Sequence, residues 1–120
     1  MTGEAPNQPG RWESPLFPLP ANGTNLAVVA THGRGHVPRQ MRWVLVSTAT
    51  GELGFLPGDE LEVVGGNNST NPTCWANATQ VGLAMNAATW NWSFTQKTGA
   101  STANLTFMTT RWALKCYCDW

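Results

Sequence analysis

Residues 31–38 read THGRGHVP and lead directly into RQMRWVLVS at residues 39–47. The glycines Gly33 and Gly35 and the proline Pro38 disfavour a helix in the first stretch, because glycine loosens the backbone and proline lacks an amide hydrogen. The second stretch has the β-branched and aromatic residues that are typical of a strand. The sequence therefore predicts a glycine turn at residues 31–38 that leads into a strand at residues 41–47.

Further strands are expected on both sides of this turn and strand. Short apolar or alternating segments occur at residues 26–30, 53–56, 61–64, 73–75, 80–85, 89–95, 104–109 and 111–117. Turn residues separate these segments, and Pro57 with Gly58 marks a tight turn before residues 61–64. The pattern predicts an all-β fold, a single antiparallel β-sandwich at residues 26–120, with a small barrel as the alternative.

Residues 1–25 differ from the rest of the chain in their proline content. Five prolines favour extended backbone over helix: Pro6, Pro9, Pro15, Pro18 and Pro20. We expect an extended N-terminal arm with one of two roles. It is either a loose leader, as chain termini commonly are, or a peptide that lies along a partner protein with Trp12 and Phe17 as aromatic anchors.

Charge and hydropathy exclude several classes of partner. Seven Lys and Arg residues balance seven Asp and Glu residues, so no basic face is expected to hold the phosphates of a nucleic acid. No apolar run is long enough to span a bilayer, and the first residues lack the segments of a signal peptide. We expect a soluble chain without nucleic-acid or membrane partners, and we interpret its Asn-x-Ser/Thr matches as chance.

Cysteine and histidine spacing predicts neither a metal centre nor a cofactor. We expect Cys116 and Cys118 to point to opposite faces of an extended segment, so that no bond joins them, whereas a bond from Cys74 to either stays open. Buried free thiols are the main interpretation. His32 and His36 lie four residues apart in a glycine turn, where this spacing fixes no ligand geometry. A hydrogen-bonded turn histidine is therefore expected.

No combination of residues predicts catalysis. Asp59 and Glu60 are neighbours in a turn, where their carboxyl groups diverge and do not form an acid and base pair. Residues 33–35 (GRG) lack the rest of a phosphate-binding fingerprint, and no serine lies in a nucleophile elbow. We therefore expect a protein that is not an enzyme.

The seven tryptophans are the strongest compositional signal. Three of them fall within apolar strand patterns and are expected in the core: Trp43, Trp90 and Trp112. An aromatic ring at the surface is either buried in a subunit interface or stacked on a sugar ring. This is the expectation for three others, which should be partly exposed: Trp75, Trp92 and Trp120.

The order of short motifs along the chain resembles a known family. The motifs are THGRGHVPR at residues 31–39, WVLV at 43–46, GFLPGDEL at 54–61, NATQV at 77–81, KTG at 97–99 and RWAL at 111–114. In this order they resemble small β-domains of tailed-bacteriophage virion proteins, at the tips of tail or head fibres, whose layout is similar to that of the H-type lectins. The resemblance implies a structural protein of the virion surface and a homotrimer.

The role on the particle stays open between two alternatives. If the loops at residues 65–72 and 97–101 face the host, the domain is a fibre or spike appendage that contacts a receptor such as a host-surface glycan. The candidate ligand residues in these loops are Asn67, Asn68, Ser69, Thr70 and Lys97. If the arm clamps capsid subunits, the domain is a decoration protein of the head. A secreted carbohydrate-binding module is a third class, and the expected partners are virion proteins of the capsid, collar or tail.

Overall fold

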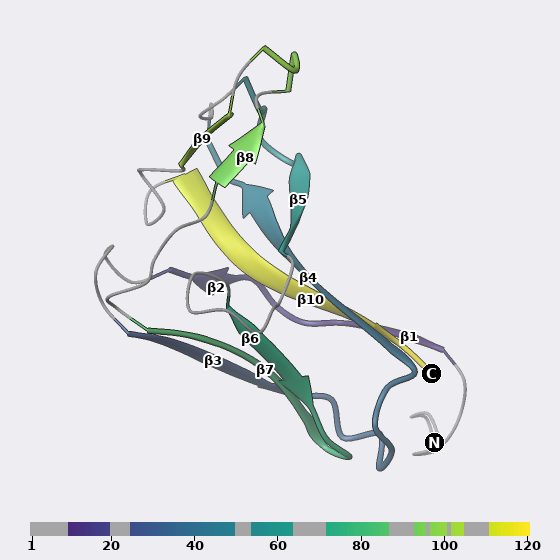
Figure 1. Cartoon of the computed structure of the whole chain (residues 1–120). Helices are drawn as coiled ribbons and strands as arrows, with labels where there is room; N and C mark the ends of the chain where they lie inside the picture. Colours follow the sequence, from purple (N-terminus) through teal and green to yellow (C-terminus); the bar gives the residue numbers. More distant parts are fainter. Residues whose placement is uncertain are drawn as a thin grey trace.

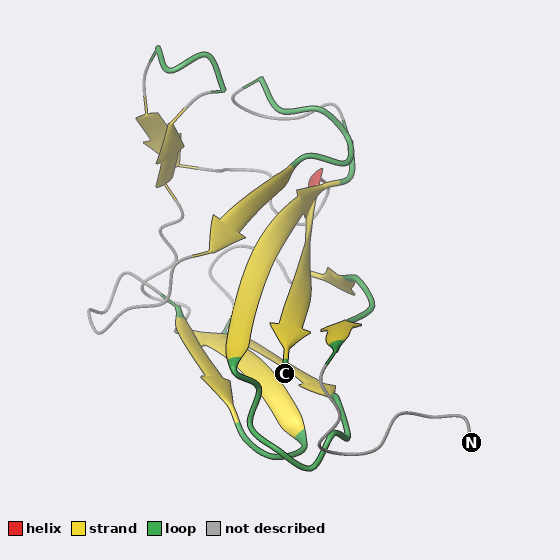
Figure 2. Ribbon diagram, turned by 90° about the vertical axis from the view of Figure 1, so that its right-hand side faces the viewer, coloured by secondary structure: helices red, strands yellow, loops and turns green. Residues whose placement is uncertain are grey.

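The structure is a computed structural model that describes residues 10–19, 25–49, 54–63, 72–86, 93–95, 97–100, 102–104 and 111–120. The strands are β1 (Arg11–Glu13), β2 (Phe17–Pro18), β3 (Leu26–Thr31), β4 (Gln40–Ser47), β5 (Glu60–Val63), β6 (Thr73–Ala76), β7 (Gln80–Met85), β8 (Ser93–Thr95), β9 (Thr102–Asn104) and β10 (Trp112–Asp119). Figure 2 shows that strands make up nearly all of the regular structure in these residues. The predicted all-β fold is confirmed.

Two antiparallel sheets pack together as the layers of a β-sandwich (Figure 1). The larger sheet has the strand order β1-β10-β4-β5, and β2 also pairs with β10; the smaller sheet has the order β3-β7-β6. Strands β8 and β9 form a separate hairpin. Strands β10 and β4 pair over their full lengths, from Trp112 opposite Ser47 to Asp119 opposite Gln40, and so form the middle of the larger sheet.

The core forms because alternate residues of the facing strands are apolar. In β3, Leu26, Val28 and Ala30 are buried while the residues between them are exposed, as the period of two in a strand requires. Trp43 and Trp112 lie in this core as expected, each 1% exposed, whereas Trp90 lies outside the described residues. The buried cluster consists of Leu19, Leu26, Val28, Ala30, Trp43, Leu45, Val63, Val81, Leu83, Met85, Trp112, Leu114, Cys116 and Cys118.

Most of the predicted strands are confirmed with small shifts at their ends. These are the segments predicted at residues 26–30, 41–47, 61–64, 73–75, 80–85 and 111–117. Residues 54–56 form no strand, although they belong to a segment that was expected to be extended. Residues 89–92 and 105–109, which complete two other predicted strands, lie outside the described residues.

Residues 11–19 belong to the larger sheet, which corrects the prediction of a separate arm for this part of the chain. Strand β1 pairs with β10 from Arg11 to Glu13, and β2 pairs with β10 at Phe17 and Pro18. Between the two strands, the buried Ser14 donates its N–H to the carbonyl of Cys116, and its Oγ accepts the N–H of Cys116, both at 2.9 Å. Residues 1–9 and 20–24 of the predicted arm lie outside the described residues.

The two predicted arm anchors pack on the protein's own core. Phe17 lies against Trp43 with their ring centres 6.4 Å apart, and Trp12 lies against His32 with their ring centres 6.2 Å apart. The prolines do not prevent this pairing, because Pro15 lies between the two strands and Pro18 ends β2. Trp12 and Phe17 are therefore aromatic residues of two edge strands that complete the larger sheet.

Candidate ligand-binding site

The outer face of the larger sheet brings together polar side chains from three distant segments. Two adjacent rows of cross-strand partners lie across β1, β10 and β4. The first row is Arg11, Asp119 and Gln40, and the second row is Glu13, Tyr117 and Arg42. Because residues two apart in a strand share a face, both rows point to the same side of the sheet. This side is opposite to the one on which the neighbouring Cys116 and Cys118 enter the core.

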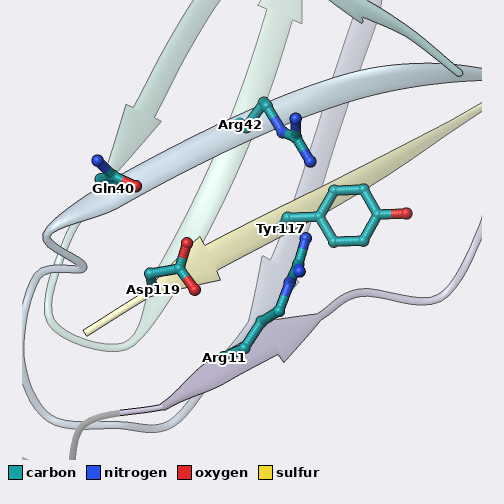
Figure 3. Close-up of a pocket in the computed structure, with 5 residues that line it drawn as sticks. All are labelled: Arg11, Gln40, Arg42, Tyr117 and Asp119. Atoms are coloured by element: carbon teal, nitrogen blue, oxygen red, sulfur yellow. The ribbon is translucent and has the colours of Figure 1, made fainter.

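Five of these residues line a pocket of about 270 Å³, here called the Tyr117 pocket: Arg11, Gln40, Arg42, Tyr117 and Asp119 (Figure 3). Figure 3 shows that Arg11 and Arg42 extend toward the Tyr117 ring from the strands on either side of β10. Their Cζ atoms lie 4.7 and 5.2 Å from the ring centre. The negative face of an aromatic ring attracts cations at this distance, so Tyr117 holds the two guanidinium groups at the pocket.

The carboxylates beside the pocket are engaged with other groups. The Glu13 carboxylate pairs with the Lys115 ammonium at 2.8 Å, and Glu60 accepts a hydrogen bond from the Tyr117 hydroxyl at 2.5 Å. Within the described residues, neither Arg11 nor Arg42 forms an ion pair with a carboxylate. The hydrogen-bond donors of both guanidinium groups therefore stay available to a bound molecule.

These contacts also fix the protonation of the groups around the pocket. The hydrogen bond to Glu60 raises the pKa of Tyr117 above its ordinary value, since the carboxylate disfavours a phenolate beside it. The hydrogen bond between Lys115 and Glu13 raises the pKa of Lys115 and lowers the pKa of Glu13. At neutral pH, Tyr117 is thus protonated and donates its O–H to Glu60, and Lys115 is a cation paired with Glu13.

The predicted turn histidine, His32, is a buried structural residue. Its Nδ1 accepts the backbone N–H of Arg34 at 3.0 Å, so its proton lies on Nε2 and is donated to the carbonyl of Asn77, also at 3.0 Å. The ring packs edge-on against Trp120, with the ring centres 4.8 Å apart. His32 thereby joins the turn to the loop before β7 and to the C-terminal end of the described chain.

The other turn residues hold the backbone shape. Gly33 and Gly35 have φ of 65° and 81°, a left-handed conformation that favours glycine, and Pro38 is buried. The Trp120 indole donates a hydrogen bond from Nε1 to the carbonyl of His36 at 3.0 Å. Gly58, in the other predicted turn, has φ of 93°. None of these residues lines the Tyr117 pocket.

The candidate ligand residues predicted in the loops are only partly within the described chain. Lys97 lies in the loop between β8 and β9, and its Nζ forms an ion pair with Asp59 at 2.6 Å. Asp59 also accepts the N–H of Leu56, and this bond, followed by that to Lys97, lowers the pKa of Asp59. Asn67, Asn68, Ser69 and Thr70 lie outside the described residues.

The cysteines correct one prediction. Cys116 and Cys118 share a face of β10, both fully buried with their Sγ atoms 3.7 Å apart, because side chains two residues apart in a strand point the same way. All three cysteines are free, and burial raises the pKa of the Cys74 thiol to about 11.

Among the described residues, no group of three metal-ligating side chains is found. In the same residues, no helix has the length and apolar character to cross a bilayer.

The residues of the Tyr117 pocket were not predicted from the sequence. One signal was present, since polar residues alternate at Gln40 and Arg42 and again at Lys115, Tyr117 and Asp119. The pairing that places Arg11 beside them joins positions more than a hundred residues apart, and sequence periodicity does not reveal it.

Compared with known proteins, the chain matches no family model, no curated protein and no solved structure.

Proposed function

We propose that this chain is a non-enzymatic attachment domain on the surface of a bacteriophage particle, a trimeric appendage of the fibre or spike type. The Tyr117 pocket carries the proposal, because it displays, on an exposed sheet face, two guanidinium groups that form no ion pair with a carboxylate of the described residues. Such a surface is suited to hold a ligand outside the protein. The proposed location on a phage particle is supported by the order of the six sequence motifs, which resembles that of virion β-domains.

The motifs that carry this resemblance contact one another in pairs. The turn at residues 31–39 joins residues 77–81 through the hydrogen bond from His32 to Asn77. Residues 45–46 pair with residues 113–114 in the larger sheet. Residues 54–61 meet residues 97–99 through the ion pair of Asp59 with Lys97. The six motifs thus form three contacting pairs, which supports interpreting their order as the signature of a fold.

The proposed trimer rests on the resemblance to virion β-domains, which implies a homotrimer. The proposed trimer would have three times the 13.0 kDa mass of the chain, and light scattering coupled to gel filtration tests it. A monomer at all concentrations would contradict it.

Immunogold electron microscopy of purified particles tests the location. Label on the tail, the collar or the fibre tips is the expected result. Label over the whole head would replace the appendage by the alternative function, a capsid decoration protein held by neighbouring head subunits. Particles without label would refute a virion location altogether.

A further inference from the structure

The charge of the Tyr117 pocket selects an anionic group. Arg11 and Arg42 lie on opposite sides of β10 and both reach the same aromatic ring, so their positive charges converge on one small volume. A guanidinium presents parallel N–H donors that match the two oxygens of a carboxylate. The nearest glutamates are engaged with Lys115 and with the Tyr117 hydroxyl, so they do not fill this role.

The remaining lining residues select hydroxyl groups. Asp119 and Gln40 are direct cross-strand partners in the row next to Arg42 and Tyr117. A carboxylate such as Asp119 repels a bare inorganic anion, whereas it accepts hydrogen bonds from hydroxyl groups. The Gln40 amide both donates and accepts. A ligand that carries one acidic group and several hydroxyl groups therefore satisfies the whole pocket, which a simple anion does not.

The size and rigidity of the pocket fit one sugar unit. Its volume of about 270 Å³ is below the range of roughly 300 to 1,000 Å³ that is common for drug-sized ligands. All five lining residues lie on paired strands, and Tyr117 is fixed by its bond to Glu60. Backbone that is already paired loses little further entropy on binding, which favours a small ligand.

We infer that the Tyr117 pocket binds an acidic sugar, with Arg11 and Arg42 on the carboxylate and with Asp119 and Gln40 on the ring hydroxyl groups. This inference rests on the proposed attachment function and names the chemical class of its receptor, an acidic polysaccharide. It places recognition on the sheet face of β1, β10 and β4 and uses none of the ligand residues predicted in the loops.

Titration of the purified chain with the methyl glycoside of glucuronic acid tests the inference by NMR. The Nε–H signals of Arg11 and Arg42 should shift with a dissociation constant on the order of 1 mM, the range expected for a single sugar unit. Methyl glucoside, which has the same ring without the carboxylate, should cause no shift. Arg42→Gln and Arg11→Gln should each weaken binding about tenfold or more, because each removes a charge-assisted hydrogen bond.

Arg39→Gln is the matched control. It removes one positive charge beside Gln40 from an exposed arginine that does not line the pocket, so affinity should stay unchanged. Equal binding of methyl glucoside, equal binding of inorganic phosphate, or full affinity in both pocket variants would each overturn the inference. Because the titration uses the isolated chain, its failure is distinct from a failure of particle labelling, which bears on the proposed location.

Discussion

The indole of Trp75 lies directly over the backbone of Gly82 on the outer face of the smaller sheet. The two residues are cross-strand partners in β6 and β7, and the Cβ that an alanine would add at Gly82 overlaps Cε2 and Cζ2 of the indole. Glycine at this position is therefore required by the close approach of the ring.

Gly82→Ala should destabilise the protein by about 1–3 kcal/mol, because a rigid ring must move to admit the methyl group. Urea unfolding of the two proteins measures the difference. In a Trp75→Ala background the same substitution should cost almost nothing, since the ring is gone. An equal cost in both backgrounds would show that the indole is not the reason for glycine.

His32→Ala should lower the free energy of unfolding by about 2–4 kcal/mol, because it leaves the Arg34 N–H and the Asn77 carbonyl without their partner and opens a cavity beside Trp120. Thermal or urea unfolding measures this loss. His36→Ala is the control in the same turn, and its exposed side chain should contribute within about 0.5 kcal/mol. Similar losses for both variants would contradict the structural role of His32.

Tyr117 is the only tyrosine of the chain, so ultraviolet absorbance of the phenolate reports this residue alone. Its titration midpoint should lie above the ordinary pKa of tyrosine, and Glu60→Gln should lower that pKa because the neighbouring negative charge is removed. Glu62→Gln, also on β5, is the matched control and should leave the midpoint in place. An unchanged pKa in Glu60→Gln would contradict the contact.

The Cys74 thiol should react slowly with Ellman's reagent at pH 8. Its pKa of about 11 leaves a thiolate fraction of roughly one thousandth. The pKa of Cys74 in the folded protein lies above the ordinary thiol pKa of about 9, so the folded state holds this proton more tightly. Its contribution to stability is full below about pH 9 and is lost as the pH rises toward about 11. Comparison with Cys74→Ala in urea unfolding at several pH values isolates this dependence, and an identical pH profile would contradict it.

The fold class and most strands could be predicted because their signal is local. The burial of Leu26, Val28 and Ala30 follows from alternation along one strand, and the turn at residues 31–38 follows from its glycines. The attachment of residues 11–19 to the sheet could not be predicted in this way. Prolines at Pro15 and Pro18 suggested an arm, while the pairing with β10 depends on contacts with the far end of the chain.

The site was harder to predict than the fold for the same reason. The sequence places its candidate ligand residues in polar loops, but the Tyr117 pocket lies on the face of a sheet and takes its residues from β1, β4 and β10. Arg11 and Arg42 become a pair only when both strands flank β10 in the observed register. A single sequence carries no direct information on that register.

The bridge between Ser14 and Cys116 spans 102 positions of the chain. Strand β10, which carries Cys116, lies between β1 and β4 and follows every other described strand in the sequence. Contacts of such high sequence separation slow folding, because a large loop must close before they form. The larger sheet thus has no centre until β10 joins it, whereas the smaller sheet does not need β10 and can form earlier, so closure of the larger sheet is a late folding step.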